Sequence, residues 1–262
     1  MTTKRHYTTQ LQAGLGLLQE TRLLLHIWEP GMTSPALYQA ALHSGEFPNV
    51  SARRLRNIVR ECFAPRYLLA DGQPARYLKQ LAGALAPAEL NQLFFLHTCR
   101  ANPILADFVR ELFWGRYAAG DDQVTLDEAR AFVRRGIDDG KTAKRWSDST
   151  VQRVTSYLLG CCTDYGLLGR RTLSARVIVP YRIEATTAAY LAHDLHFASL
   201  GDNALLTHLD WQLFGLGRED VRDELKRLSL RGHLILQSAG EIARIGWKHQ
   251  HLEDLVGVLA EG

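Results

Sequence analysis

The chain has 262 residues, of which 46% are hydrophobic and 23% charged, so it can bury one large core or two to three small ones and is not intrinsically disordered. Its apolar runs are short, none approaches the roughly 18 residues that span a bilayer, and no leader pattern opens the chain, so we expect a cytoplasmic protein with no membrane partner. The four cysteines form no Cys-x-x-Cys pair, which excludes a disulfide scaffold and a zinc module.

Charge is distributed unevenly along the chain. Residues 141–182 carry eight Lys and Arg against two Asp and Glu, a balance of +6, although the whole chain carries only +3. Residues 183–262 are acidic, with seven bases against twelve acids. A basic stretch of this kind is typical of proteins that bind phosphate backbones, and the alternative is a solvated face whose acids lie nearby in space.

The first 120 residues show helical signals throughout. Pro30-Gly31 ends the first helix, Ser34 caps a second whose first turn holds Pro35, and Ser51 caps a third that Pro65 ends. The helices expected here are 15–28, 34–43, 52–63, 74–85, 87–100 and 103–119. Their spacing is typical of a helical bundle.

The pattern changes after residue 120. Thr125 and Glu128 predict a capping box for a helix over about 126–137, and a polar connection leads to a second helix capped by Ser147 or Asp148. This second helix should bury Val151, Val154, Leu158, Cys161, Cys162 and Tyr165 and turn Ser149, Gln152, Arg153 and Ser156 outward. A basic turn and a β-branched strand over 177–179 follow, which is the order of a winged-helix module.

The last eighty residues repeat that order more weakly. Helices are expected at about 184–200, 203–214 and 219–231, strands at 234–236 and 242–247, and a last helix at about 250–259. The helix over 219–231 begins with four acids, which would repel phosphate and favour a protein-docking or structural role: Glu219, Asp220, Asp223 and Glu224.

The expected fold class is mainly α, with an N-terminal helical bundle followed by winged helix-turn-helix-like units that carry small β-hairpin wings. The corresponding domains are 1–120, 121–183 with a basic wing, and 184–262, which is acidic.

The sequence contains no convincing catalytic motif. The segment 136–142 is one residue short of a phosphate-binding P-loop and follows a helix instead of a strand, and the pair His193 and His196 has no further ligands nearby in sequence. We therefore expect no catalytic residues, no metal, no cofactor and no small-molecule substrate.

Two basic sets remain as candidate contacts to double-stranded DNA. The middle set combines the entry to the predicted recognition helix, its outward face and its wing: Lys141, Lys144, Arg145, Ser149, Gln152, Arg153, Arg170, Arg171 and Arg176. The N-terminal set lies on the helix that begins after Ser51: Arg53, Arg54, Arg56 and Arg60. The sequence leaves open which set is the main surface.

Three segments carry a resemblance to a known family: Tyr7-Thr8, the run Glu20-Thr21-Arg22-Leu23-Leu24, and the helix Ser51-Ala52-Arg53-Arg54-Leu55-Arg56. With them the chain resembles the BrxA proteins of bacteriophage-exclusion (BREX) defence systems. The resemblance implies a mostly helical, DNA-binding accessory protein that acts beside other defence proteins. The rival hypotheses are a protein-protein adaptor of the defence complex without functional DNA binding, and a nuclease or other enzyme.

Overall fold

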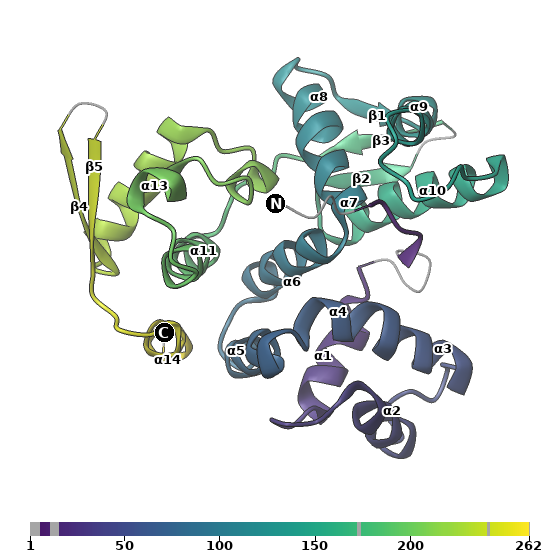
Figure 1. Cartoon of the computed structure of the whole chain (residues 1–262), viewed down its shortest axis with the longest axis horizontal. Helices are drawn as coiled ribbons and strands as arrows, with labels where there is room; N and C mark the ends of the chain where they lie inside the picture. The colour runs from purple at the N-terminus through teal and green to yellow at the C-terminus, as the bar shows by residue number, and fades with distance from the viewer. Residues whose placement is uncertain (1–5, 11–15, 172–173, 240–241, 262) are drawn as a thin grey trace. The chain divides into compact units, whose positions relative to one another are not determined.

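The computed structural model describes residues 6–10, 16–171, 174–239 and 242–261, and the side chains of residues 170, 171, 238, 239 and 242 are not described. Helices dominate, and the strands form two small antiparallel sheets, which confirms the predicted mainly α fold class. Figure 1 shows the chain coloured from its N-terminus to its C-terminus. It forms two compact units that interleave in sequence: unit 1 holds residues 1–76 and 94–181, and unit 2 holds residues 77–93 and 182–262. The predicted three-domain division stays a prediction.

Unit 1 begins with helices close to the predicted ones. They are α1 (Leu18–Ile27), α2 (Ser34–His43), α3 (Ala52–Asn57), a π-helical turn η2 (Ile58–Phe63) and α4 (Ala64–Tyr67). Ser51 caps α3 as expected, because its side chain accepts from the Arg54 amide. The predicted cap of α2 is wrong by one residue, since Thr33 accepts from Ala36 N–H and Ser34 is already helical.

Pro65 was expected to end its helix, and that expectation is wrong. The helical run continues through Pro65 to Tyr67. Proline cannot donate to the preceding turn, and the run widens to π geometry at η2 just before it. Beyond it lie a 3₁₀ turn η3 (Ala70–Gly72) and α5 (Gln73–Leu81), which is shorter at its end than predicted.

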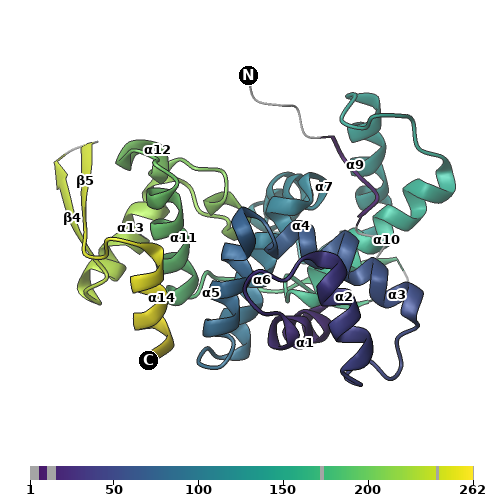
Figure 2. The ribbon, with the colours of Figure 1, turned by 60° about the horizontal axis from the view of Figure 1, so that its bottom comes forward.

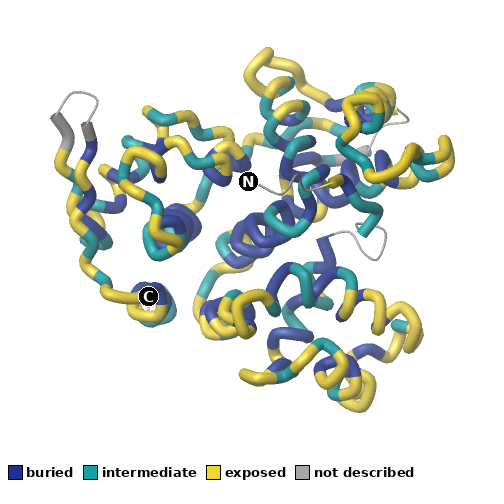
Figure 3. Tube along the Cα trace, viewed as in Figure 1, coloured by how far each residue is buried: buried dark blue, intermediate teal, exposed yellow. Residues whose placement is uncertain are grey.

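The core of unit 1 surrounds the second half of α6 (Pro87–Ala101). Residues 94–99 of this helix are buried without interruption, as the dark blue segment in Figure 3 shows. This segment is buried on every side because other elements of the unit pack all round it. The helical run that follows comprises α7 (Pro103–Asp107), a second π-helical turn η4 (Phe108–Phe113) and α8 (Trp114–Ala118).

Unit 1 ends with two helices and a three-stranded sheet. The elements are β1 (Gln123–Thr125), α9 (Leu126–Asp138), α10 (Asp148–Asp164), β2 (Leu168–Arg171) and β3 (Ala175–Ile178). The sheet order is β1-β3-β2, with both pairings antiparallel, so β3 lies between a strand from before the two helices and a strand from after them. The predicted capping box of Thr125 and Glu128 is confirmed. The strand β1 was not predicted, because three residues carry too little alternation to be recognised.

Unit 2 holds α11 (Ala185–Phe197), α12 (Asp202–Leu206), a 3₁₀ turn η5 (Trp211–Phe214), α13 (Arg218–Leu230), the hairpin β4 (Leu234–Ala239) and β5 (Ile242–Trp247), and α14 (Leu252–Glu261). The single helix expected over 203–214 is wrong. The chain turns after α12, and the Trp211 indole N–H donates to the Leu205 carbonyl at 2.9 Å, which buries the indole and satisfies a carbonyl at the helix end. Among the described residues no helix is long and apolar enough to cross a membrane.

Candidate nucleic-acid interface

Helix α10 separates its two faces as the sequence predicts. Val151, Val154 and Leu158 are buried, as are the cysteines and the tyrosine predicted beside them. Ser149, Gln152, Arg153 and Ser156 are all exposed. The helix begins after Ser147, whose hydroxyl accepts from the Thr150 amide at 3.3 Å. Its outward face is therefore a row of short or forked polar side chains that can donate and accept hydrogen bonds.

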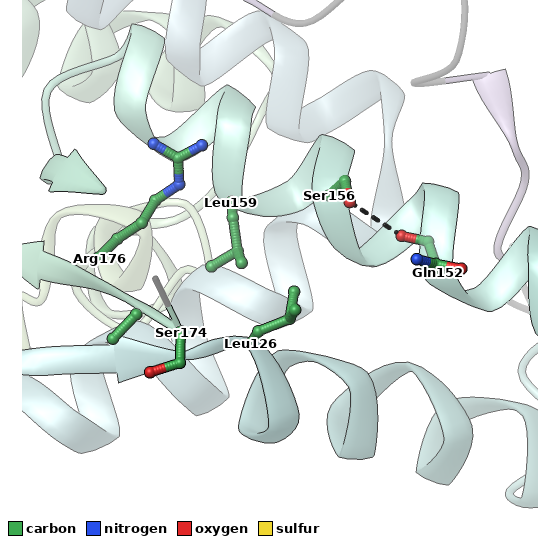
Figure 4. A pocket seen from close by; sticks show the side chains of 7 residues that line it. Leu126, Gln152, Ser156, Leu159, Ser174 and Arg176 are labelled. Atoms are coloured by element: carbon green, nitrogen blue, oxygen red, sulfur yellow. Dashed lines mark hydrogen bonds between the residues drawn. The ribbon is translucent and has the colours of Figure 1, made fainter. Parts of the chain in front are cut away.

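A hollow of about 130 Å³ lies between this outward face and β3. Gln152, Ser156 and Leu159 of α10 line one side, and Leu126, Ser174, Ala175 and Arg176 line the rest (Figure 4). The Ser156 hydroxyl donates to the Gln152 backbone carbonyl at 3.1 Å, so the Gln152 side-chain amide keeps its own hydrogen-bonding groups. The hollow brings together residues of α9, α10 and β3, and it includes Leu126, Leu159 and Ser174, which were not among the predicted site residues.

The charged members of the middle basic set differ in how far their charge is compensated. Lys144 and Arg153 are exposed and Arg176 is half-buried, and none of the three has an ion pair within the described residues. Arg145 lies 3.5 Å from Asp138, but its side chain is 83% exposed, so that pair is weak. The side chains of Arg170 and Arg171 lie outside the described residues, although both residues belong to β2.

Lys141 is the exception in this set. Its ammonium lies 3.1 Å from Asp107 and 3.3 Å from Glu111, and its side chain is only 31% exposed. Partial burial lowers the pKa of Lys141, but Tyr7 and Asp107 outweigh that effect and the net pKa is raised. Lys141 is thus a cation already held inside unit 1.

The acid at the start of α10 lies near a base. Asp148 lies 3.1 Å from Arg134 of α9, with both side chains largely exposed. This pair is therefore weak, like that of Arg145 and Asp138.

The N-terminal basic set is exposed on the run from α3 into η2. Arg53 and Arg54 have no ion pair among the described side chains, Arg56 lies over the Tyr38 ring at 5.2 Å, and Arg60 lies 3.6 Å from Glu61. This second surface is also solvent-accessible, so geometry alone leaves both sets available for contact.

The acids of α13 in unit 2 are paired within the helix. Glu219 lies 3.2 Å from Arg222, Asp223 lies 2.7 Å from Lys226, and Glu224 pairs with Arg227. The remaining acid of this set, Asp220, accepts from the Gly217 amide at 2.9 Å. The helix therefore presents alternating charges instead of the uniformly acidic face that composition suggests.

The histidine pair of α11 lies in a layer of aromatic rings. His193 is fully buried, its ring lies 4.8 Å from that of Trp247, and His196 stacks on the same indole at 4.2 Å. Within the described residues no group of three or more His, Cys, Asp or Glu is placed to hold a metal ion.

The chain is similar to a known protein family and to a solved structure. A family model described as BrxA matches residues 5–194. A crystal structure of an uncharacterized protein from Magnetospirillum magneticum is similar with a TM-score of 0.59 and 15% identity, over 73% of this chain and 95% of that one. At that identity the likeness concerns the fold alone. No curated protein matches the chain.

Proposed function

Since this chain belongs to the BrxA family of the BREX phage-defence systems, we propose that it is a non-enzymatic accessory protein of such a system that binds double-stranded DNA in the cytoplasm. In this proposal DNA binding occurs mainly through phosphates. The observation that carries it is the outward face of α10, where Ser149, Gln152 and Arg153 are exposed, together with the exposed charge of Lys144 and the half-buried charge of Arg176.

The order of elements in unit 1 supports this assignment. The elements follow one another as a helix (α8), a strand (β1), two helices (α9 and α10) and a two-stranded hairpin (β2 and β3), with β3 central in the sheet. This order is the one expected of the winged helix that we propose. In such modules the second helix of the helix-turn-helix enters the major groove, and the wing contacts the neighbouring backbone. We assign these roles to α10 and to the hairpin of β2 and β3, of which residues 172–173 lie outside the described residues.

The charged and the neutral side chains of this surface are suited to different parts of DNA. Lys144, Arg153 and Arg176 are suited to phosphates, since their charges are exposed or half-exposed and have no ion pair among the described side chains. Gln152 and Ser149 are suited to base edges or phosphate oxygens, because both are neutral hydrogen-bonding groups on the same exposed face.

A salt titration of DNA binding tests the proposal. With a fluorescent duplex of arbitrary sequence, the logarithm of the association constant should fall linearly with the logarithm of salt concentration, by roughly 0.9 per phosphate contact, and about four to six contacts are expected. Binding that is undetectable at low salt, or insensitive to salt, would remove the DNA hypothesis.

The second candidate function is a protein-protein adaptor of the defence complex. Unit 2 favours it, because Leu230 at the end of α13 is 90% exposed and Ile235 of β4 is 52% exposed. Replacing both with Ser should weaken binding to a defence subunit and leave DNA affinity unchanged if the two functions occupy separate surfaces.

A further inference from the structure

The segment around Tyr7 docks against the connection that leads into α10. The Tyr7 amide donates to the Lys141 carbonyl at 2.7 Å, and Tyr7 forms an isolated parallel bridge with Thr142. Figure 2 shows this purple segment passing beside α9. The Tyr7 side chain is only 4% exposed, so the contact buries an aromatic ring as well as a backbone pair.

A polar cluster fixes the far end of that ring. The Tyr7 hydroxyl donates to Asp107 at 2.7 Å, and the same carboxylate lies 3.1 Å from the Lys141 ammonium, which is 5.4 Å from the centre of the Tyr7 ring. Burial raises the pKa of Tyr7, and the hydrogen bond to Asp107 raises it further, so the phenol stays protonated and remains a donor.

Gly136 makes room for the ring. A Cβ atom at this position of α9 would lie 2.6 Å from Cε2 of Tyr7, which is closer than real Cβ contacts come. Glycine inside a helix costs about 1 kcal/mol relative to alanine, so its presence in α9 is consistent with a close approach that outweighs this cost.

The N-terminal part of the chain also contacts the end of α10. The Gly16 amide donates to Asp164 at 2.8 Å, and the Tyr165 hydroxyl donates to the Gly16 carbonyl at 3.1 Å. Tyr7 thus contacts the connection that precedes α10, and Gly16 contacts the residues at the end of that helix.

We infer that Tyr7 is a positioning residue for the proposed DNA surface: it holds the 141–147 connection in place, and it keeps Lys141 in an internal cluster instead of on a phosphate. The functional half of this inference rests on the proposed DNA binding. Lys141, which the sequence placed among the DNA contacts, then acts through its contacts with Asp107, Glu111 and Tyr7.

The salt dependence of DNA affinity separates positioning from contact. Lys141→Met should lower affinity without changing the slope of the log-log salt plot, whereas Arg153→Met should reduce the magnitude of the slope by about 0.9. A loss of about 0.9 from the slope in Lys141→Met would overturn the inference, because it would show a phosphate contact.

Hydrogen exchange tests, without DNA, whether Tyr7 holds the 141–147 connection in place. In the full-length chain, Tyr7→Ala should speed exchange of the amides at 141–150 and lower DNA affinity about five-fold, the equivalent of one ordinary hydrogen bond, with an unchanged salt slope. Tyr7→Phe keeps the ring and the backbone bonds but loses the hydrogen bond to Asp107, so it should speed this exchange by less than Tyr7→Ala does, and it keeps the test decisive if the alanine variant does not fold. The matched control is Tyr117→Ala, because Tyr117 is exposed on α8.

The outcomes are distinguishable. If the wild-type chain binds no DNA, the proposed function fails and the exchange measurement alone decides whether Tyr7 holds the connection. Unchanged exchange at 141–150 in the folded Tyr7→Ala and Tyr7→Phe variants overturns the inference whatever the DNA result.

Discussion

The backbone amide of Gly16 donates a 2.8 Å hydrogen bond to the carboxylate of Asp164, the last residue of α10. The two residues are 148 positions apart in the sequence. The two residues also pack closely, since a Cβ atom on Gly16 would lie 2.7 Å from Cβ of Asp164. This contact joins Gly16 to the helix that we assign to DNA binding. We therefore expect its loss to lower the free energy of unfolding.

Gly16→Ala should destabilise the protein by about 1–3 kcal/mol, because the added methyl group meets a side chain whose position the hydrogen bond fixes. Urea unfolding at pH 7 measures the effect. The matched control is Gly115→Ala in the exposed helix α8, where a Cβ meets nothing within 4 Å and alanine should stabilise by about 0.5–1 kcal/mol. Equal stability of the Gly16 variant and the wild type would show that this approach is looser than the structure has it.

The second prediction concerns the DNA surface of α10 and β3. The triple variant Lys144→Glu, Arg153→Glu and Arg176→Glu should lose more than about ten-fold in duplex affinity at low salt, because three attractive contacts become repulsive. Folding should persist, since each surface substitution usually costs under about 0.5 kcal/mol. Fluorescence anisotropy measures affinity, and circular dichroism checks the fold.

The matched control for that variant reverses the N-terminal set with Arg53→Glu, Arg54→Glu and Arg56→Glu. We expect a smaller loss of DNA affinity, because Arg56 is also engaged with Tyr38. If this control abolishes binding while the α10 variant binds normally, the DNA surface lies on α3. Normal binding by both variants would mean that the two sets are solvated faces.

The third prediction is a loss of stability in mild acid. Burial lowers the pKa of His193 to about 4, and the neighbouring His249, His233 and His196 add to that effect although the hydrogen bond to the Ala189 carbonyl opposes it. The unfolded chain takes up the proton near its ordinary pKa of about 6.5, so stability is lost as pH falls from about 6.5 towards 4. From this residue alone the loss should be about 2 kcal/mol at pH 5 relative to pH 7.

The variant His193→Phe should remove that share of the pH dependence, measured as urea midpoints at pH 7 and pH 5. His43→Phe is a matched control, because His43 makes the same ring contact to the carbonyl four residues earlier, at 2.7 Å, but is exposed. An unaltered pH dependence in His193→Phe would show that this histidine has the same pKa in the folded and in the unfolded chain.

The fourth prediction concerns the thiols. All four cysteines are buried, and burial raises the pKa of Cys161 to about 12 and that of Cys162 well above its ordinary value. Because the thiolate is the reactive form, a thiol reagent at pH 8 should modify essentially none of them in the folded protein and all four after denaturation. Rapid modification of Cys161 or Cys162 before unfolding would contradict the packing around α10.

Several elements of the fold can be predicted from residues that are close together in the sequence. The capping box of Thr125 and Glu128, the cap at Ser51 and the buried stripe of α10 depend on residues within one or two turns of each other, so the sequence alone predicts them. The family resemblance was also present in the sequence, and the family match confirms it.

Elements that depend on distant partners were missed or misplaced. The strand β1 exists because Val124 pairs with Arg176, and the helix expected at 203–214 is broken where Trp211 turns back to Leu205. The helical run continued through Pro65 because a π-helical turn precedes the proline. Each outcome rests on packing or hydrogen bonds that override local propensity.

The candidate site shows the same division. The sequence by itself determined which face of α10 is polar and where the positive charge is concentrated, because periodicity and composition are properties of the chain alone. Only the tertiary structure decided that Lys141 is held by Asp107 and Glu111, and that Leu126, Ser156 and Ser174 meet at one hollow. The physical reason is that a charge is compensated, and a cavity is lined, by whichever residues the fold brings within a few ångströms, and these come from segments far apart along the chain.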